Sequence, residues 1–204
     1  MNQSQRKKIL PTLARSSPLI FLIILITNVF IYPSYESIYL LVSYIGVVFS
    51  NWVAKNAIAK PLYNLLNISD IPIIGLGNRP PGASSCGITL DNKPASSFGM
   101  PSGHSQIAWT IATYLIAKYI ISNYYDNNNK NNNNIIWKTF NLLFILICAV
   151  YISYSRVYIE GCHTLQQVII GGIIGIIGGL IIYKLEDKLK HKLKPIVISY
   201  LNKN

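Results

Sequence analysis

The stretch Leu19-Ile20-Phe21-Leu22-Ile23-Ile24 lies inside a window from Ser16 to Tyr35 that contains no charged residue. A helix needs about 20 mostly apolar residues to cross a bilayer, and this window has that length. Further apolar windows run from Ser37 to about Ala59, Ser105 to Tyr124, Ile135 to Ser155 and His163 to Tyr183. The sequence therefore predicts an all-α fold, an integral membrane helical bundle with about five transmembrane helices.

The composition supports a membrane protein. Hydrophobic residues make up 51% of the 204 positions and charged residues only 12%, values that exclude a soluble globule or a disordered chain. The net charge of +11 comes from Lys and Arg at the ends of the apolar windows and in both tails, not from one basic stripe. We therefore expect the lipid bilayer and its phosphates as partners, no nucleic acid, and no obligatory protein partner.

The chain divides into three parts. Residues 1–18 form a basic N-terminal segment, 19–183 form the transmembrane domain, and 184–204 form a basic amphipathic tail that Pro195 is expected to interrupt. Residues 126–134, almost all asparagine, are expected to be a loop without chemistry. In the last window, Gly171, Gly175 and Gly179 form a small-residue ladder for close helix packing.

The number of crossings places two distant loops together. If the second crossing exits on one face, the segment from Lys60 to Gly103 lies there, and the loop from Arg156 to Cys162 returns to the same face two crossings later. A site built from both loops must lie at one membrane surface.

The first loop ends with Pro101-Ser102-Gly103-His104 directly before an apolar helix. Proline fixes the start, Gly103 allows close approach of a ligand, and the free N–H groups of the helix start, with the hydroxyl of Ser102, suit an anion. An imidazole at His104 can give a proton to a leaving oxygen near neutral pH. The motif alone is equally compatible with an ordinary helix start.

The second loop opens the last helix with His163. Gln167, four residues later on the same helical face, can accept a hydrogen bond from one ring nitrogen and leave the other free as a nucleophile. Arg156 and Arg79 offer planar donor forks for a phosphoryl group. A hydrogen-bonded helix-cap histidine is the simpler interpretation of His163 alone.

Together these motifs resemble those of the type 2 phosphatidic acid phosphatase (PAP2) superfamily, from about Asn51 to Gly179. Pro101-Ser102-Gly103-His104 matches its second block in full, and Ser155-Arg156 with His163 match its third block in part. The flanking residues look most like dolichyl-diphosphate phosphatases, which also have glutamine at the position of Gln167. The resemblance implies a PAP2-like core and hydrolysis of a polyisoprenyl diphosphate at the lumenal face of the endoplasmic reticulum. It also implies no metal or other cofactor, His163 as nucleophile through a phosphohistidine, and His104 as general acid.

Three features depart from that pattern. Six residues instead of five separate Arg156 from His163, so the loop carrying Glu160, Gly161 and Cys162 must bulge. The lysine of the Arg-Pro block is missing at its usual distance, where Pro72 stands, and Lys55 is our candidate, with Lys60 competing. Neutral Gln167 cannot stabilise an imidazolium as a carboxylate would, which predicts slower chemistry.

Several alternatives stay open at this stage. The same site could hydrolyse phosphatidic acid and other lipid phosphates, or the chain could be a catalytically degenerate protein that binds anionic lipid. Lys and Arg are more frequent on the face opposite the site, which places the site away from the cytosol, and Asn67-Ile68-Ser69 is a glycosylation sequon on the site's face. Cys86 and Cys162 lie in the two loops that meet and could pair.

Overall fold

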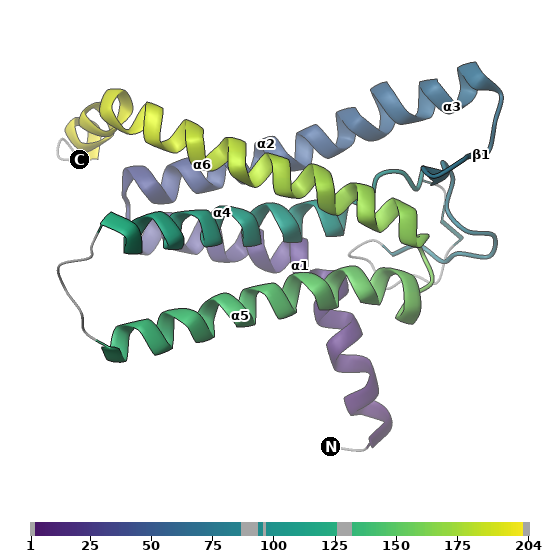
Figure 1. The fold of residues 1–204 in the computed structure, drawn as a ribbon, viewed down its shortest axis with the longest axis horizontal. Coiled ribbons are helices and arrows are strands. Elements are labelled where there is room, and N and C mark those ends of the chain that lie inside the picture. Colours follow the sequence, from purple (N-terminus) through teal and green to yellow (C-terminus); the bar gives the residue numbers. More distant parts are fainter. Residues whose placement is uncertain (1–2, 87–93, 96, 126–131, 202–204) are drawn as a thin grey trace.

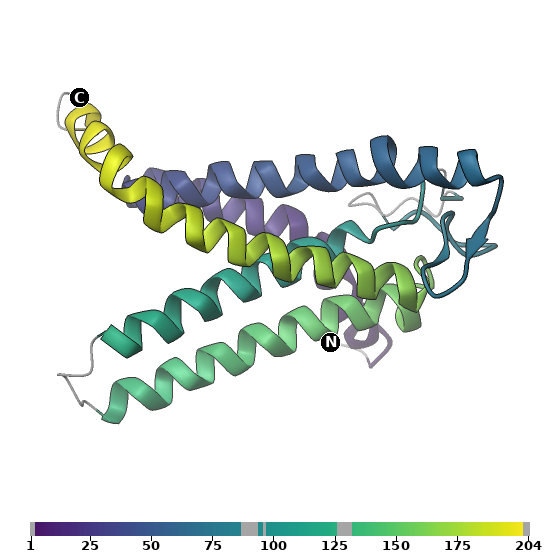
Figure 2. The same ribbon diagram turned by 45° about the horizontal axis from the view of Figure 1, so that its top comes forward.

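In a computed structural model the chain is described over residues 3–86, 94–95, 97–125 and 132–201. Its long helices are α1 (Gln3–Ile31), α2 (Tyr35–Val53), α4 (Gly103–Tyr125), α5 (Asn132–Tyr154) and α6 (Leu165–Leu201), arranged side by side (Figures 1 and 2). The shorter elements are the π-helical turns η1 (Ala54–Ala59) and η2 (Ser155–Ile159), helix α3 (Lys60–Leu66), and strands β1 (Asp70–Ile71) and β2 (Gly75–Leu76). The predicted all-α membrane bundle is confirmed.

Within the described residues, four helical stretches are long and apolar enough to cross a membrane. They are Ile9–Ile31, Tyr35–Leu66, Thr139–Ile159 and Leu165–Ser199. The fifth long helix, α4, agrees with the predicted window but is more polar, because Ser105, Gln106 and Thr110 lie buried on its surface. α4 packs against α1, α2, α5 and α6, so its polar groups bond to neighbouring helices instead of facing lipid.

The termini of the helices differ from the predicted ones. α1 begins about four turns before the predicted window and contains Pro11 and Pro18, and its N-terminal part bends away from the bundle (Figure 1). A proline inside a helix removes one backbone hydrogen bond, so a bend of this kind is expected. α6 continues through Pro195 to Leu201, so the predicted interruption of the tail is wrong. Most of the asparagine-rich loop lies outside the described residues, and α5 begins at Asn132, within its predicted bounds.

The predicted glycine ladder joins α6 to α4. A Cβ atom at Gly171 would lie 2.5 Å from the carbonyl oxygen of Ser102, and one at Gly179 would lie 2.6 Å from that of Thr110. Gly175 meets the carbonyl of Gln106 in the same way. Because only glycine allows this approach, the two helices lie in backbone contact. The N-terminal ends of α4 and α6 are thereby held together.

Both loops lie at that end of the bundle, as the number of crossings predicts (Figure 1). The hairpin of β1 and β2 pairs Asp70 with Leu76 in antiparallel register and was not foreseen. Arg79, which follows it, donates to the carbonyl oxygen of Cys162 at 3.1 Å, and Cys86 forms a disulfide with Cys162. The same-face prediction is therefore confirmed by contacts between residues 76 or more positions apart.

Candidate active site

The candidate site lies where the N-terminal ends of α4 and α6 meet. The amide N–H of Ser102 donates to the carbonyl oxygen of Gln167 at 3.1 Å, and this bond joins the two motifs directly. Pro101 follows a cis peptide bond from Met100, and Gly103 begins α4. A Cβ atom at Gly103 would lie 2.8 Å from the Asn51 side-chain oxygen, so a larger residue there would displace this side chain of α2. The first N–H groups of α4 have no acceptor inside the helix and are available to an anion.

The predicted hydrogen bond between His163 and Gln167 is present, with 2.8 Å between Nδ1 and Oε1. Gln167 is fully buried, and its Nε2 donates to the carbonyl oxygens of Leu76 at 2.8 Å and Asn78 at 2.6 Å. Since both amide hydrogens are used on carbonyls, Oε1 must face the imidazole and accept. Nδ1 of His163 therefore carries the ring proton, and Nε2 is unprotonated and accepts from Arg79.

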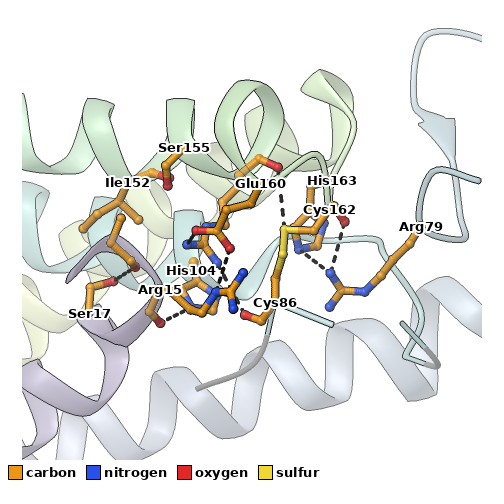
Figure 3. A network of polar contacts seen from close by, with 12 residues as sticks. Arg15, Ser17, Arg79, Cys86, His104, Ile152, Ser155, Glu160, Cys162 and His163 are labelled. Carbon is orange, nitrogen blue, oxygen red and sulfur yellow. Dashed lines mark hydrogen bonds and ion pairs between the residues drawn. A yellow bond between two sulfur atoms is a disulfide. The ribbon is translucent and has the colours of Figure 1, made fainter. Parts of the chain in front are cut away.

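Arg79 lies beside that nitrogen, with its Nη1 at 3.4 Å from Nε2 of His163 (Figure 3). Its position is fixed from two sides. Nη1 donates to the carbonyl oxygen of Cys162, and Nε and Nη2 donate to Ser97. Burial, followed by the positive charge of Arg79, lowers the pKa of His163 well below its ordinary value of 6.5, so the imidazole is neutral at pH 7.

Arg156 is fully buried behind the two loops. Nη1 donates to the carbonyl oxygen of Cys86 at 3.4 Å, and Nη2 forms an ion pair with Glu160. Among the residues that the structure describes, Nε of Arg156 and Oγ of Ser102 are buried polar atoms without a hydrogen-bond partner. Buried polar groups nearly always have a partner, so these two atoms point to an anionic ligand whose oxygens would satisfy them.

The structure favours Lys55 over Lys60. The positive charge of Lys55 contributes to the lowered pKa of His104 and of His163, so its side chain lies near the site from η1. Lys60 begins α3 and is exposed. With Lys55, Arg79 and Arg156, three cationic side chains are directed at one region.

His104, in the first turn of α4 at the predicted membrane surface, is held by α1. Its Nε2 lies 2.9 Å from the carbonyl oxygen of Arg15. Because a carbonyl only accepts, Nε2 carries the hydrogen and Nδ1 is the nitrogen left to exchange a proton. Burial and the positive charge of Arg156 lower the pKa of His104 to about 3, so this imidazole is also neutral without a ligand.

The π-helical turn η2 accommodates the extra residue between Arg156 and His163. The amide of Glu160 donates to the carbonyl oxygen of Ser155 at 2.8 Å, five residues back, as in a π-helical turn. Gly161 follows with a φ of +60°. The predicted bulge is therefore present, and it begins at Ser155, earlier than the expected segment from Glu160 to Cys162.

The disulfide between Cys86 and Cys162 joins the two loops next to the candidate nucleophile (Figure 3). Both of its residues also hold an arginine, because the carbonyl of Cys162 accepts from Arg79 and that of Cys86 accepts from Arg156. In the described part of the chain, Cys86, Cys162 and Glu160 are the group with metal-ligand spacing. Two of its three donors are the sulfurs of the disulfide, which leaves Glu160 as the one conventional ligand.

Sequence patterns did not identify three residues of this region as site residues. Arg15 lies in the basic N-terminal segment, and no motif indicates that α1 reaches His104. The amide pair of Asn51 and Gln106, 2.8 Å apart, ties α2 to α4 one turn below the site. Only the fold shows that these two residues bond.

The fold and these motifs define a membrane protein of the PAP2 superfamily, which the chain matches over residues 36–190. The chain therefore belongs to this superfamily. It is 29% identical over 125 residues to dolichyldiphosphatase 1 of Callithrix jacchus and of Homo sapiens, covering 61% of this chain and 42% of each relative. Dolichyldiphosphatase 1 of Mus musculus is 24% identical over 150 residues, which is 74% of this chain and 52% of the relative. The chain thus spans about half the length of these curated relatives. No solved structure matches it.

Proposed function

We propose that this chain is an integral membrane phosphohydrolase that releases phosphate from a lipid diphosphate or monophosphate, with polyisoprenyl diphosphate as its substrate. One observation carries the proposal. The imidazole of His163 is held in one tautomer by Gln167, and its unprotonated Nε2 lies 3.4 Å from Nη1 of Arg79. This arrangement suits attack on a phosphoryl group, because the guanidinium can move its hydrogen bond from Nε2 to a phosphoryl oxygen when the substrate binds.

In the proposed first step, Nε2 of His163 attacks the terminal phosphorus. The phosphorus–nitrogen bond forms as the bond from phosphorus to the bridging oxygen breaks. The leaving oxygen takes a proton from Nδ1 of His104. Entry of the anionic phosphate opposes the effect of burial and of Arg156 on His104, raising its pKa so that the ring can carry that proton.

In the second step, a water molecule attacks the phosphohistidine. His104 accepts the proton of this water, the phosphorus–nitrogen bond breaks, and inorganic phosphate leaves. Lys55, Arg79, Arg156 and the first amides of α4 balance the charge on the phosphoryl oxygens through both steps. These groups provide the charge that a metal ion would otherwise supply, so we propose a reaction that needs no metal.

The choice of lipid follows from the relatives. Dolichyldiphosphatase 1 is the name of the curated proteins that the chain resembles at 29% identity. Phosphatidic acid is the competing substrate, because it would use the same phosphate site. Competition between dolichyl diphosphate and phosphatidic acid in detergent separates the two.

The site is proposed to face the lumen of the endoplasmic reticulum. The excess of Lys and Arg on the opposite face supports this orientation, and so does a disulfide at the site, since disulfides persist in oxidising compartments. Asn67 is exposed at the end of α3, where an oligosaccharide could be attached. A glycosidase-sensitive mass shift that is lost in Asn67→Gln is expected, and cytosolic labelling of this loop would contradict the orientation.

The activity is tested with purified protein, a panel of lipid phosphates, and EDTA present. We expect the parent to release phosphate from dolichyl diphosphate and His163→Ala to release none. The matched control is His191→Ala, which changes a histidine in the exposed C-terminal part of α6 and leaves the rate unchanged. Equal rates for His163→Ala and the parent would refute the proposal.

A further inference from the structure

We propose that Arg15 and Glu160 are positioning residues that orient Arg156 for the phosphoryl group, an inference that rests on the proposed function. Neither residue belongs to the superfamily's motifs. Arg15 precedes the matched segment 36–190, and Glu160 stands in the loop that is one residue longer than the superfamily's spacing. Both nevertheless converge on motif residues (Figure 3).

Glu160 bridges two guanidinium groups. Its Oε2 accepts from Nε of Arg15 at 3.0 Å, and its Oε1 accepts from Nη2 of Arg156. The side chain of Glu160 is 4% exposed and that of Arg156 is 0% exposed, whereas that of Arg15 is 16% exposed. A carboxylate shared in this way is held on both sides, because a buried charge without a partner is strongly unfavourable.

The bridge fixes the plane of the Arg156 guanidinium. Nη2 is bound by Glu160 and Nη1 by the carbonyl oxygen of Cys86, while Nε has no partner among the residues that the structure describes. A guanidinium is planar and rigid, so two held nitrogens determine the direction of the third N–H. The direction of Nε, the donor left for a phosphoryl oxygen, thus depends on Glu160.

Arg15 also contacts the other half of the site. Its carbonyl oxygen accepts from Nε2 of His104 at 2.9 Å, while its side chain binds Glu160. One residue of α1 therefore contacts both the candidate acid and the carboxylate that orients Arg156. We infer that α1 is part of the catalytic unit as well as a membrane anchor.

A positioning role and a merely structural tie between α1 and η2 predict different kinetics. If Glu160 orients Arg156, Glu160→Gln has two effects on the guanidinium of Arg156. The group keeps its positive charge, which no carboxylate now balances, and the direction of its N–H groups is less fixed. The kcat then falls roughly ten- to a hundredfold, the range for groups that orient a ligand-binding side chain, and KM does not rise. If the tie is only structural, the yield of folded protein falls while kcat per folded molecule stays unchanged.

The experiment compares the parent with Glu160→Gln, Arg15→Gln, their double variant and Arg15→Lys, using the lipid phosphate that the parent hydrolyses. We expect the double variant to lose no more kcat than Glu160→Gln alone, because both changes break the same contact between Arg15 and Glu160. Arg15→Lys should keep most of the kcat that Arg15→Gln loses. Arg15→Gln is the second test should Glu160→Gln not fold. Glu36→Gln is the matched control, since it removes a carboxylate from an ion pair with Lys194 at the other end of the bundle.

Orthovanadate binding, measured as a thermal shift, tests the inference without turnover. We expect its affinity to fall about tenfold or more in Glu160→Gln, the range for such orienting groups, and to be unchanged in Glu36→Gln. If the parent hydrolyses no lipid phosphate but this difference is found, the proposed activity fails and the inference on Arg156 stands. Values of kcat and vanadate affinity within twofold of the parent for both single variants, or no vanadate binding by the parent, would overturn the inference.

Discussion

Replacing Gln167 with glutamate supplies a carboxylate that could stabilise an imidazolium at His163, yet we expect it to damage this protein. Gln167 is fully buried and uses both amide hydrogens on the carbonyl oxygens of Leu76 and Asn78. A carboxylate can still accept from His163, but it cannot donate to these carbonyls and brings a negative charge against them. Each buried acceptor left unpaired costs about 1–3 kcal/mol, so Gln167→Glu is expected to lower the free energy of unfolding by about 2–6 kcal/mol.

The assay is thermal or urea unfolding in detergent at pH 8, with phosphate release measured per folded molecule. Gln166→Glu is the matched control, because Gln166 is the exposed neighbour in the same turn of α6. Parent-like stability of Gln167→Glu at pH 8, with equal or faster turnover, would refute the reasoning. It would mean that the amide of Gln167 does not donate to the two carbonyls and that the tautomer of His163 is not set by them.

Three further changes test other parts of the site. Because the pKa of His163 is well below 6.5, kcat/KM should not decline between pH 7 and pH 6 through protonation of this ring. A decline with a midpoint near pH 6.5, seen also with a substrate whose charge is constant over this range, would contradict the lowered pKa. Arg79→Gln removes a donor beside the nucleophile and should lower kcat by about 10²–10³, as the loss of one oxyanion-hole donor does in other enzymes. A loss of less than about tenfold in phosphate release would argue against a contact between Arg79 and the phosphoryl group. Gly171→Ala, whose Cβ would lie 2.5 Å from the Ser102 carbonyl oxygen, should lower activity and the unfolding temperature. Gly46→Ala, with open space around it, should change neither. Equal effects of the two substitutions would show that α4 and α6 are not in backbone contact.

Much of the site could be predicted because local motifs and the number of crossings are properties of the sequence. Pro101-Ser102-Gly103-His104 and His163 mark two helix starts, and an even number of intervening crossings returns the chain to the same surface. The glycine spacing of α6 also predicted close packing correctly. These inferences needed no knowledge of which helices touch.

What was missed depends on contacts between distant segments. Nothing in the sequence around Arg15 shows that its carbonyl reaches His104, 89 residues later. The choice between Lys55 and Lys60 depends on a π-helical turn, which sets the direction of each side chain. Pro195 predicted an interruption, but a helix can bend at proline and continue when no other element occupies its path.

The most direct test of the account is to identify the residue that carries the phosphoryl group. The protein is mixed with labelled dolichyl diphosphate, quenched in alkali to preserve phosphoramidate bonds, and analysed by peptide mass spectrometry. We predict label on the peptide that contains His163, no label in His163→Ala, and a longer-lived label in His104→Ala because the water that cleaves the intermediate lacks its base. Phosphate release from the parent without any label on His163 under these conditions, or turnover by His163→Ala, would contradict the account.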